Sequence, residues 1–387
     1  MPDLGQAALV IDAGGTSVKA VYCPADSLLQ DRLPPRDMIP GLASQQFGPG
    51  NLETLGETGL ATRVGEILQW LSTLGRHKAD LSQIELGIGM AGLRTDESGA
   101  LEDQELVTNV FASKGFSPER TIVRNDADWL VFTEMRAAAL ISGTGSHCVI
   151  KSGEHFVRSG GLGANPLRDR GSGFFVGEVA VTMAVELTQG MSVGDRTLST
   201  KQLKQSKFIK VVTRHIAQFL AERDGDSSDH NVQCYYDMGI IELSRRRLLD
   251  PDDGVMLGPD EIKMFAGLAR KIYDLVDGGD PFAWRVLEKQ AHVLAKMIKG
   301  AELRLREALE EAGEPRSARM ELPVGLQGGV FSGRTGREYL IKMLERGVLS
   351  PRIKHHFHRF GTGSDEQDPM LQPMSRLLIK KNHDLSS

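Results

Sequence analysis

The chain has few cysteines and no pair of them at the C-x-x-C spacing of a redox or zinc motif. Cys23, Cys148 and Cys234 lie far apart among the 387 residues. A set this sparse and odd in number supports neither a disulfide framework nor a zinc site, and it fits a reducing compartment. A basic-then-apolar leader and an apolar run of membrane-spanning length are also missing. We therefore expect a cytoplasmic protein with no membrane partner.

A surplus of positive charge is missing as well. The formal net charge is −5, the isoelectric point is near 6.1, and no basic run stands out. This charge balance argues against electrostatic binding of nucleic acid. The 40% hydrophobic and 25% charged residues are ordinary for a globular protein. Because 387 residues exceed what one hydrophobic core usually serves, we expect two domains.

The stretch Asp12–Lys19 is the first that points to chemistry. An apolar run over 8–11 predicts a buried strand that stops at Asp12, and residues 18–22 predict a returning strand. Gly14 and Gly15 allow a tight turn between the two strands. The sequence therefore predicts a hairpin whose backbone N–H groups can face a phosphate.

Two side-chain types strengthen this interpretation of the hairpin. Thr16 and Ser17 add hydroxyl donors, and Asp12 stands where a carboxylate could hold a hydrated magnesium ion. The pattern differs from a Walker A loop, which is followed by a helix and ends in Gly-Lys-Ser/Thr. An ordinary turn remains the alternative.

The chain then alternates between predicted helices and strands. We expect helices over 53–74 and 101–113 and strands over 84–90 and 121–123. This order implies a mostly parallel sheet whose strand ends face a ligand crevice. Asp126 stands at such an end, either facing a ligand or capping a helix over 127–136. Asn51, at the exit of a Gly-Pro-Gly turn, is likewise either a helix cap or a ligand contact.

The strand–turn–strand pattern recurs in the second half of the chain. Residues 139–141 predict a strand, 142–146 a second turn rich in glycine and hydroxyls, and 147–150 a returning strand. Two such hairpins in successive lobes could clamp a polyphosphate between domains.

Further along, two short stretches leave alternatives open. Asp169 precedes an apolar helix over 174–187, and it could bind sugar hydroxyls or cap that helix. Gly328 and Gly329 follow a strand over 322–326, and they could form a platform for an adenine ring or an ordinary turn.

The other segments of the second half suggest support rather than chemistry. The helix over 281–311 has one apolar face and favours internal support over a partner helix. The polar region 190–260 predicts helices over 201–222 and 231–249, with His215 and His230 at the surface. We expect the basic tail after residue 350 to be loop-like, with its histidines solvated.

Eight short motifs follow one another in an order that resembles a known family. They are Asp12–Lys19, Gly48–Asn51, Met90–Gly92, Asn125–Ala127, Ile141–Cys148, Gly160–Gly163, Asp169–Gly173 and Gln327–Phe331. Together they resemble the BadF/BadG/BcrA/BcrD ATPase family and its N-acetylglucosamine kinases, within the actin/hexokinase-type ATPase superfamily. One departure is Leu162, which stands where the close mammalian-type kinases carry a tryptophan near the sugar.

The resemblance implies an α/β protein with a two-lobed actin/hexokinase-like (ribonuclease H-like) fold. Each lobe would be a mixed β-sheet flanked by helices, with the active site in the cleft between the lobes. The implied domains are an N-terminal lobe over 1–136, a C-terminal lobe over 137–350 with a helical elaboration at about 190–260, and a tail over 351–387.

The resemblance also implies cofactors and residue roles. ATP and Mg²⁺ would be the cofactors, and an amino sugar, most simply N-acetylglucosamine phosphorylated at its 6-hydroxyl, would be the acceptor. Asp126 would be the general base and Asp12 would position the metal ion. The ATP and phosphate residues would be Gly14, Gly15, Thr16, Lys19, Gly143, Thr144, Gly145, Gly328 and Gly329. The sugar residues would be Asn51, Asn125, Asp126, Gly161 and Asp169.

Several other functions stay open at this point. The chain could instead phosphorylate glucosamine or N-acetylmuramic acid. A dehydratase-activating ATPase of the same family would need interface cysteines for an iron–sulfur cluster, and Cys148 has no second cysteine near it in sequence. A non-catalytic sugar sensor would usually carry an added helix-turn-helix. A homodimer is common in such families.

Overall fold

The computed structural model describes residues 7–14, 17–24, 41–75, 84–94, 97–118, 120–131, 136–143, 145–153, 155–160, 170–193, 197–225, 227–245, 259–313, 320–331, 334–347 and 353–359. They form two compact units: unit 1 holds the described residues up to Ala137 and also Arg359, and unit 2 runs from Ala138 to His358. No helix in these described ranges is both long and apolar enough to cross a membrane.

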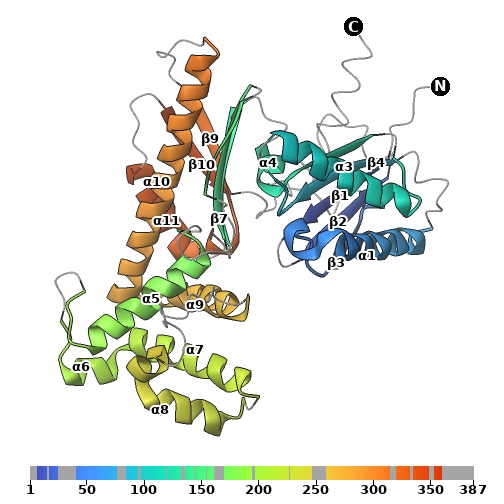
Figure 1. Ribbon diagram of the computed structural model, residues 1–387. Coiled ribbons are helices and arrows are strands. Elements are labelled where there is room, and N and C mark those ends of the chain that lie inside the picture. The colour runs from blue at the N-terminus through green and yellow to red at the C-terminus, as the bar shows by residue number, and fades with distance from the viewer. Residues whose placement is uncertain are drawn as a thin grey trace. The chain divides into compact units, whose positions relative to one another are not determined.

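Unit 1 is built on a five-stranded mixed sheet, called sheet 1 (Figure 1). Its strands are β1 (Ala7–Ala13), β2 (Val18–Cys23), β3 (Ala43–Phe47), β4 (Ile84–Met90) and β5 (Thr121–Asn125), in the order β3-β2-β1-β4-β5. β2 is antiparallel to β1 and β3, whereas β1, β4 and β5 run parallel. Its helices are α1 (Leu52–Thr73), α3 (Glu97–Ser113) and α4 (Asp126–Val131).

The two faces of sheet 1 are covered differently. On one face, alternate residues such as Leu9, Ile11 and Ile88 are buried in a core with α1 and α3. On the opposite face, the glycines of β4 leave room for the indole ring of Trp129, which belongs to α4. A side chain at Gly87 would bring its Cβ within 2.5 Å of that ring, and one at Gly89 within 3.1 Å. Glycine at both positions therefore lets α4 pack directly on β4.

Unit 2 is built on a second five-stranded sheet, called sheet 2. Its strands are β6 (Arg136–Ser142), β7 (Ser146–Ser152), β8 (His155–Gly160), β9 (Met320–Gln327) and β10 (Ile353–Arg359), in the order β10-β9-β6-β7-β8. β6 is parallel to β9, and β7 is antiparallel to β8. Numbered in chain order within its own unit, sheet 2 has the same strand order as sheet 1. The predicted recurrence of the hairpin is thus part of a repeated sheet.

The helices of unit 2 form one layer against the sheet and a helical extension. They are α5 (Gly173–Thr188), α6 (Thr200–Gln205), α7 (Lys207–Arg223), α8 (Asp229–Arg245), α9 (Pro259–Asp277), α10 (Pro281–Glu311), the 3₁₀ turn η3 (Gly329–Phe331) and α11 (Arg334–Gly347). The carboxylate of Asp280 caps α10 and Pro281 occupies its first turn. Because α10 buries its apolar face against β7, β8 and neighbouring helices, its predicted internal role is confirmed (Figure 1).

Three predicted elements differ from the structure. The helix expected over 127–136 ends at Val131, because Arg136 already belongs to β6. The helix expected over 201–222 is broken at Ser206, whose hydroxyl accepts the N–H of Ile209 and starts α7. The tail expected to be loop-like contains β10, since an edge strand pairs through its backbone and needs no apolar pattern.

Candidate functional site

The predicted acidic residues of unit 1 gather at one edge of sheet 1. The strand register places Asp12 of β1 opposite Gly89 of β4, and Gly89 opposite Arg124 of β5. Asn125 and Asp126 therefore follow at the same carboxyl edge as Asp12, with β4 between them. Neighbouring strands lie about 4.8 Å apart, so the two acidic segments are separated by about 10 Å.

The Gly48–Asn51 loop is attached to this edge through its backbone. Val18 N–H donates to Gly48 O over 2.9 Å, and Gly50 N–H donates to Gly14 O over 3.0 Å. At the far end of the loop, Leu52 N–H donates to Ala91 O over 3.0 Å. The loop thus joins the first hairpin to the end of β4.

Asn51 fills the first of the two roles that its sequence left open, the start of a helix, and its ligand contact stays a prediction. Its carbonyl accepts the N–H of Leu55 over 3.0 Å, so it occupies the start of α1. Its side-chain oxygen lies directly against Gly92, which has a positive φ of 80° and where any Cβ would collide with that oxygen. The amide of Asn51 is therefore held at the same edge as Asp12 and Asp126.

An arginine of α1 holds the loop from outside. The Nε–H of Arg63 donates to Pro49 O over 3.2 Å, and its guanidinium also pairs with Glu66. A Cβ at Gly48 would come within 2.6 Å of Nη2, so glycine is needed for the guanidinium to lie there. Arg63 thus fixes the loop that carries Asn51, a role that the sequence did not reveal.

Asp126 is the first residue of α4 and is anchored at its start. Its Oδ1 accepts the N–H of Ala127 over 2.8 Å, and Asn125 Oδ1 lies 3.1 Å from the same N–H. Burial raises the pKa of the Asp126 carboxyl above its ordinary value, the Ala127 hydrogen bond opposes this shift, and the charge of Asp128 adds to it. A carboxyl group with a raised pKa at a strand end is typical of an acid–base residue.

Lys19 lies next to the predicted metal position. It pairs with Asp12 across the β1–β2 ladder, so both side chains stand on the face of sheet 1 that carries α4. Both are half-buried. The placement puts a positive charge beside the carboxylate, where phosphate oxygens would also be attracted.

In unit 2, three glycines come together at the second hairpin. Gly143 and Gly328 are predicted site residues, and Gly173 begins α5. Gly173 N–H, at the start of α5, donates to Gly143 O over 2.6 Å. Gly328 has a φ of 106°, and a Cβ built there would come within 2.2 Å of Ser142 O and 3.0 Å of Gly143 N, so only glycine lets the turn after β9 lie against this hairpin. The first hairpin glycine, the N-terminus of α5 and the turn after β9 therefore form one neutral surface of backbone groups, in which the N–H of Gly143 is donated to Gly145 O and that of Gly173 to Gly143 O.

The segment before α5 is held onto this hairpin by hydroxyls and an amide. Ser142 Oγ–H and Gln290 Nε2–H both donate to Gly171 O over 2.8 Å, and Ser146 Oγ–H donates to Arg170 O over 2.9 Å. The cap of α5 is Ser172, whose hydroxyl accepts the N–H of Phe175. Capping of this helix, one role considered for Asp169, is therefore filled by Ser172.

Several predicted site residues lie outside the described residues: Gly15, Thr16, Thr144, Gly161 and Asp169. Their roles stay predictions, as does the clamp between domains. In the part of the chain that the structure describes, no three His, Cys, Asp or Glu side chains are grouped to hold a metal ion. A single carboxylate such as Asp12 is compatible with Mg²⁺, which is commonly bound by one or two carboxylates together with phosphates and water.

Two supporting residues were missed by sequence reasoning. Trp129 fixes α4, and thus Asp126, by packing on Gly87 and Gly89. The Gly-x-Gly spacing in a strand was the available signal, because it leaves one face flat for a large ring. Arg63 gave no signal, since its contact joins two segments only through the fold.

The two helix-flanked mixed sheets, with one strand order in both, confirm the predicted α/β fold class. No protein-family model matches the chain, and no curated protein matches it by sequence.

Solved structures match over nearly the whole chain. A candidate N-acetylglucosamine kinase from Porphyromonas gingivalis is 17% identical with a TM-score of 0.54, covering 97% of this chain and 99% of that one. A second, from Chromobacterium violaceum, is 18% identical with a TM-score of 0.49 and the same coverage. A ROK family glucokinase from Streptomyces griseus, in complex with glucose and AMPPNP, is 15% identical with a TM-score of 0.46, also at 97% and 99%. The first likeness shows a shared fold.

Proposed function

We propose that this protein is an ATP- and Mg²⁺-dependent sugar kinase that phosphorylates an amino sugar, with N-acetylglucosamine and its 6-hydroxyl as the favoured acceptor. The observation that carries the proposal is the carboxyl edge of sheet 1, where Asp12, Asn51 and Asp126 converge. The motif resemblance to the BadF/BadG family and the fold shared with a candidate N-acetylglucosamine kinase support the same class.

The residues at this edge suit the demands of phosphoryl transfer. That reaction needs positioning and charge neutralisation more than covalent help. In this proposal Asp126 accepts the proton of the attacking hydroxyl, and Asn51 and Asn125 orient the sugar. A positioned base of this kind contributes about 10²–10⁴-fold. Gly161 and Asp169 are proposed as further sugar contacts.

The nucleotide would be held by both hairpins. ATP with Mg²⁺ would supply the transferred phosphoryl group. We propose that backbone groups around Gly14 and Gly143 face its phosphates, that Lys19 adds charge, and that Gly328 and Gly329 border the adenosine. The neutral surface of unit 2 fits a phosphate chain whose charge is already partly balanced by the metal ion. The corresponding domains are proposed as residues 1–136 and 137–350.

The thiols weigh against the dehydratase-activator alternative. Cys148 is completely buried, and burial raises the pKa of its thiol to about 12. An iron–sulfur ligand must be a thiolate near an accessible interface. Cys23 is also buried, and Cys234 is the remaining cysteine.

The test is ADP release from ATP and Mg²⁺ with a panel of acceptors. The panel holds N-acetylglucosamine, glucosamine, N-acetylmuramic acid, N-acetylmannosamine and glucose, with a no-sugar control. Stimulation by one amino sugar would support the proposal and name the acceptor. ADP release that is independent of every sugar, or silence across the panel, would contradict it.

A further inference from the structure

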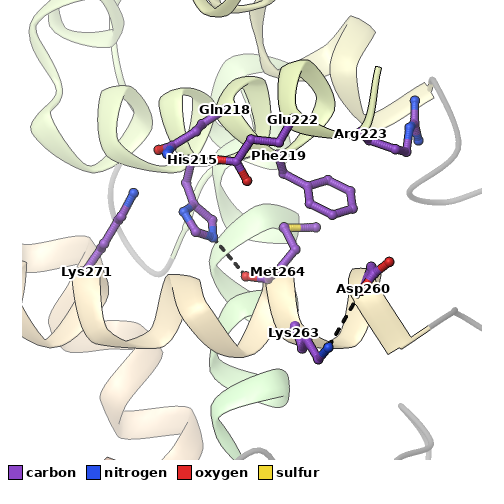
Figure 2. A pocket seen from close by; sticks show the side chains of 9 residues that line it. All are labelled: His215, Gln218, Phe219, Glu222, Arg223, Asp260, Lys263, Met264 and Lys271. Carbon is purple, nitrogen blue, oxygen red and sulfur yellow. Dashed lines mark hydrogen bonds and ion pairs between the residues drawn. The ribbon is translucent and has the colours of Figure 1, made fainter. Parts of the chain in front are cut away.

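A solvent-open groove of about 510 Å³ lies between α7 and α9, in the region where the sequence suggested no chemistry (Figure 2). Its lining residues come from one face of each helix: His215, Gln218, Phe219, Glu222, Arg223, Asp260, Lys263, Met264 and Lys271. The volume is that of a small-molecule site. No proposed catalytic residue is among them.

The groove has a fixed floor. His215, predicted at the surface, is half-buried because α9 packs over it, and its Nε2–H donates to Met264 O over 2.8 Å. Since a carbonyl can only accept, this bond fixes the tautomer and leaves Nδ1 as an acceptor. Figure 2 shows the ring of Phe219 beside the thioether of Met264 in the middle of the groove.

The charges at the far end of the groove are already balanced. Lys263 pairs with Asp260 over 3.8 Å, and Arg223 pairs with Asp224 over 3.4 Å. Figure 2 shows Lys263 beside Asp260 on α9, with Arg223 above them at the end of α7. This end therefore has little charge left for a ligand.

The end beside His215 has two opposite charges from the two facing helices. Among the described residues, Lys271 of α9 has no ion-pair partner, and Glu222 of α7 accepts a hydrogen bond from Gln218 Nε2 over 2.9 Å through Oε1 only. Both charges act on His215: burial lowers the pKa of its imidazole, the Met264 bond opposes this, Lys271 lowers it further and Glu222 raises it. The imidazole thus lies between a cation and an anion.

We propose that this groove binds a small zwitterion of the amino-acid type with an apolar side chain. Its carboxylate would pair with Lys271, its ammonium with Glu222 and His215 Nδ1, and its side chain would lie on Phe219 and Met264. A simple anion would leave Glu222 unbalanced, and a simple cation would leave Lys271 unbalanced. The zwitterion complements both charges and the apolar floor.

The groove is one helix away from the second hairpin. On the other side of α9, the backbone carbonyls of Phe265 and Ala266 lie against Gly177 and Gly173 of α5. Gly173 in turn donates to Gly143 over 2.6 Å. Resting on the proposed function, we expect ligand in the groove to change nucleotide affinity through this contact.

Binding is tested by calorimetry on the full chain with L-phenylalanine, 3-phenylpropionate and phenethylamine. The wild type should bind the amino acid at least about tenfold more tightly than either single-charge analogue. Lys271→Gln should weaken the binding of L-phenylalanine about tenfold. Glu222→Gln should bind L-phenylalanine no more tightly than 3-phenylpropionate. Lys263→Gln is the matched control on α9 and should bind as the wild type does. No binding, or binding unaffected by Lys271→Gln, would overturn the site.

Coupling is tested separately by AMPPNP binding with and without saturating L-phenylalanine. We expect a change in nucleotide affinity of about fivefold, absent in Lys271→Gln. An unchanged affinity would overturn the coupling. Failure of AMPPNP to bind at all would instead count against the proposed function, while calorimetry would still decide the zwitterion site.

Discussion

The two units share one sheet and differ in what they place at its edge. In both, a glycine at or just before the start of a helix donates to the first glycine of the hairpin turn, Gly50 to Gly14 in unit 1 and Gly173 to Gly143 in unit 2. The second-last residue of the first strand, however, is Asp12 in unit 1 and Ile141 in unit 2.

The same contrast holds at the other strand ends. In unit 1, β5 is followed by the acidic Asp126, whereas in unit 2 β9 is followed by Gly328. Unit 1 therefore presents carboxylates, and the hairpin of unit 2 presents neutral backbone and hydroxyl groups. Under the proposed function, acid–base chemistry would belong to unit 1 and unit 2 would mainly hold a ligand.

The largest expected effect comes from removing the proposed base. Asp126→Asn should lower turnover by at least about 10²-fold while AMPPNP still binds, because the nucleotide contacts are proposed elsewhere. Steady-state kinetics and calorimetry check the two parts. Asp229→Asn, also in the first turn of a helix but exposed, is the control and should keep full activity. Comparable activity in both variants would remove Asp126 from its role.

The next effect tests whether the close backbone packing at Gly328 supports the hairpin of unit 2. Gly328→Ala should destabilise the protein by about 1–3 kcal/mol, because of the positive φ and the contact with Ser142 O. It should also weaken AMPPNP binding, since the hairpin must move. Gly329→Ala is the neighbour control, where a Cβ meets nothing within 4 Å. Thermal unfolding and calorimetry check both, and equal stability of the two variants would contradict the packing role of Gly328.

A smaller effect is expected for Arg63, which holds the Gly48–Asn51 loop. Arg63→Ala should raise the KM for the sugar about fivefold, because the variant loses one charge-assisted hydrogen bond to the loop. The kcat should stay within about twofold of the wild-type value. Arg285 forms the same i,i+3 ion pair with Glu288 as Arg63 does with Glu66, but it belongs to α10 of unit 2 and not to the unit that carries the loop. Arg285→Ala should leave the KM unchanged. A lower kcat at constant KM in Arg63→Ala would assign the residue to another role.

The smallest effect concerns the acid limb of the pH profile. The raised pKa of Asp126 means that activity falls as pH drops through that pKa and the base becomes protonated. Asp128 contributes to the rise through its charge. Asp128→Asn should therefore move the acid limb to lower pH, with activity at pH 8 little changed. A profile that stays in place, in a variant with wild-type thermal stability, would exclude this influence.

Strongly patterned elements could be predicted from the sequence with their bounds. In the strand Ile84–Met90 apolar residues alternate with a glutamate and two glycines, and the helix Pro281–Glu311 has a period, a cap and a proline that agree. The strand-end rule also placed Asp126 correctly at the edge of the sheet, because parallel strands must end together.

Contacts between distant segments could not be predicted. The half-burial of His215 depends on α9, which contacts it through a residue 49 positions further along the chain. The role of Arg63 depends on a loop 14 residues before it. β10 pairs through its backbone, so its polar sequence gave no signal. Each of these features depends on a neighbour that only the fold supplies.

The most direct test of the central claim is the stoichiometry of the reaction, measured by phosphorus NMR. With ATP, Mg²⁺ and the stimulating amino sugar, the wild type should form one sugar phosphate for each ADP, and Asp126→Asn should form neither. ADP formed together with inorganic phosphate and no sugar phosphate would contradict a kinase whose chemistry belongs to unit 1.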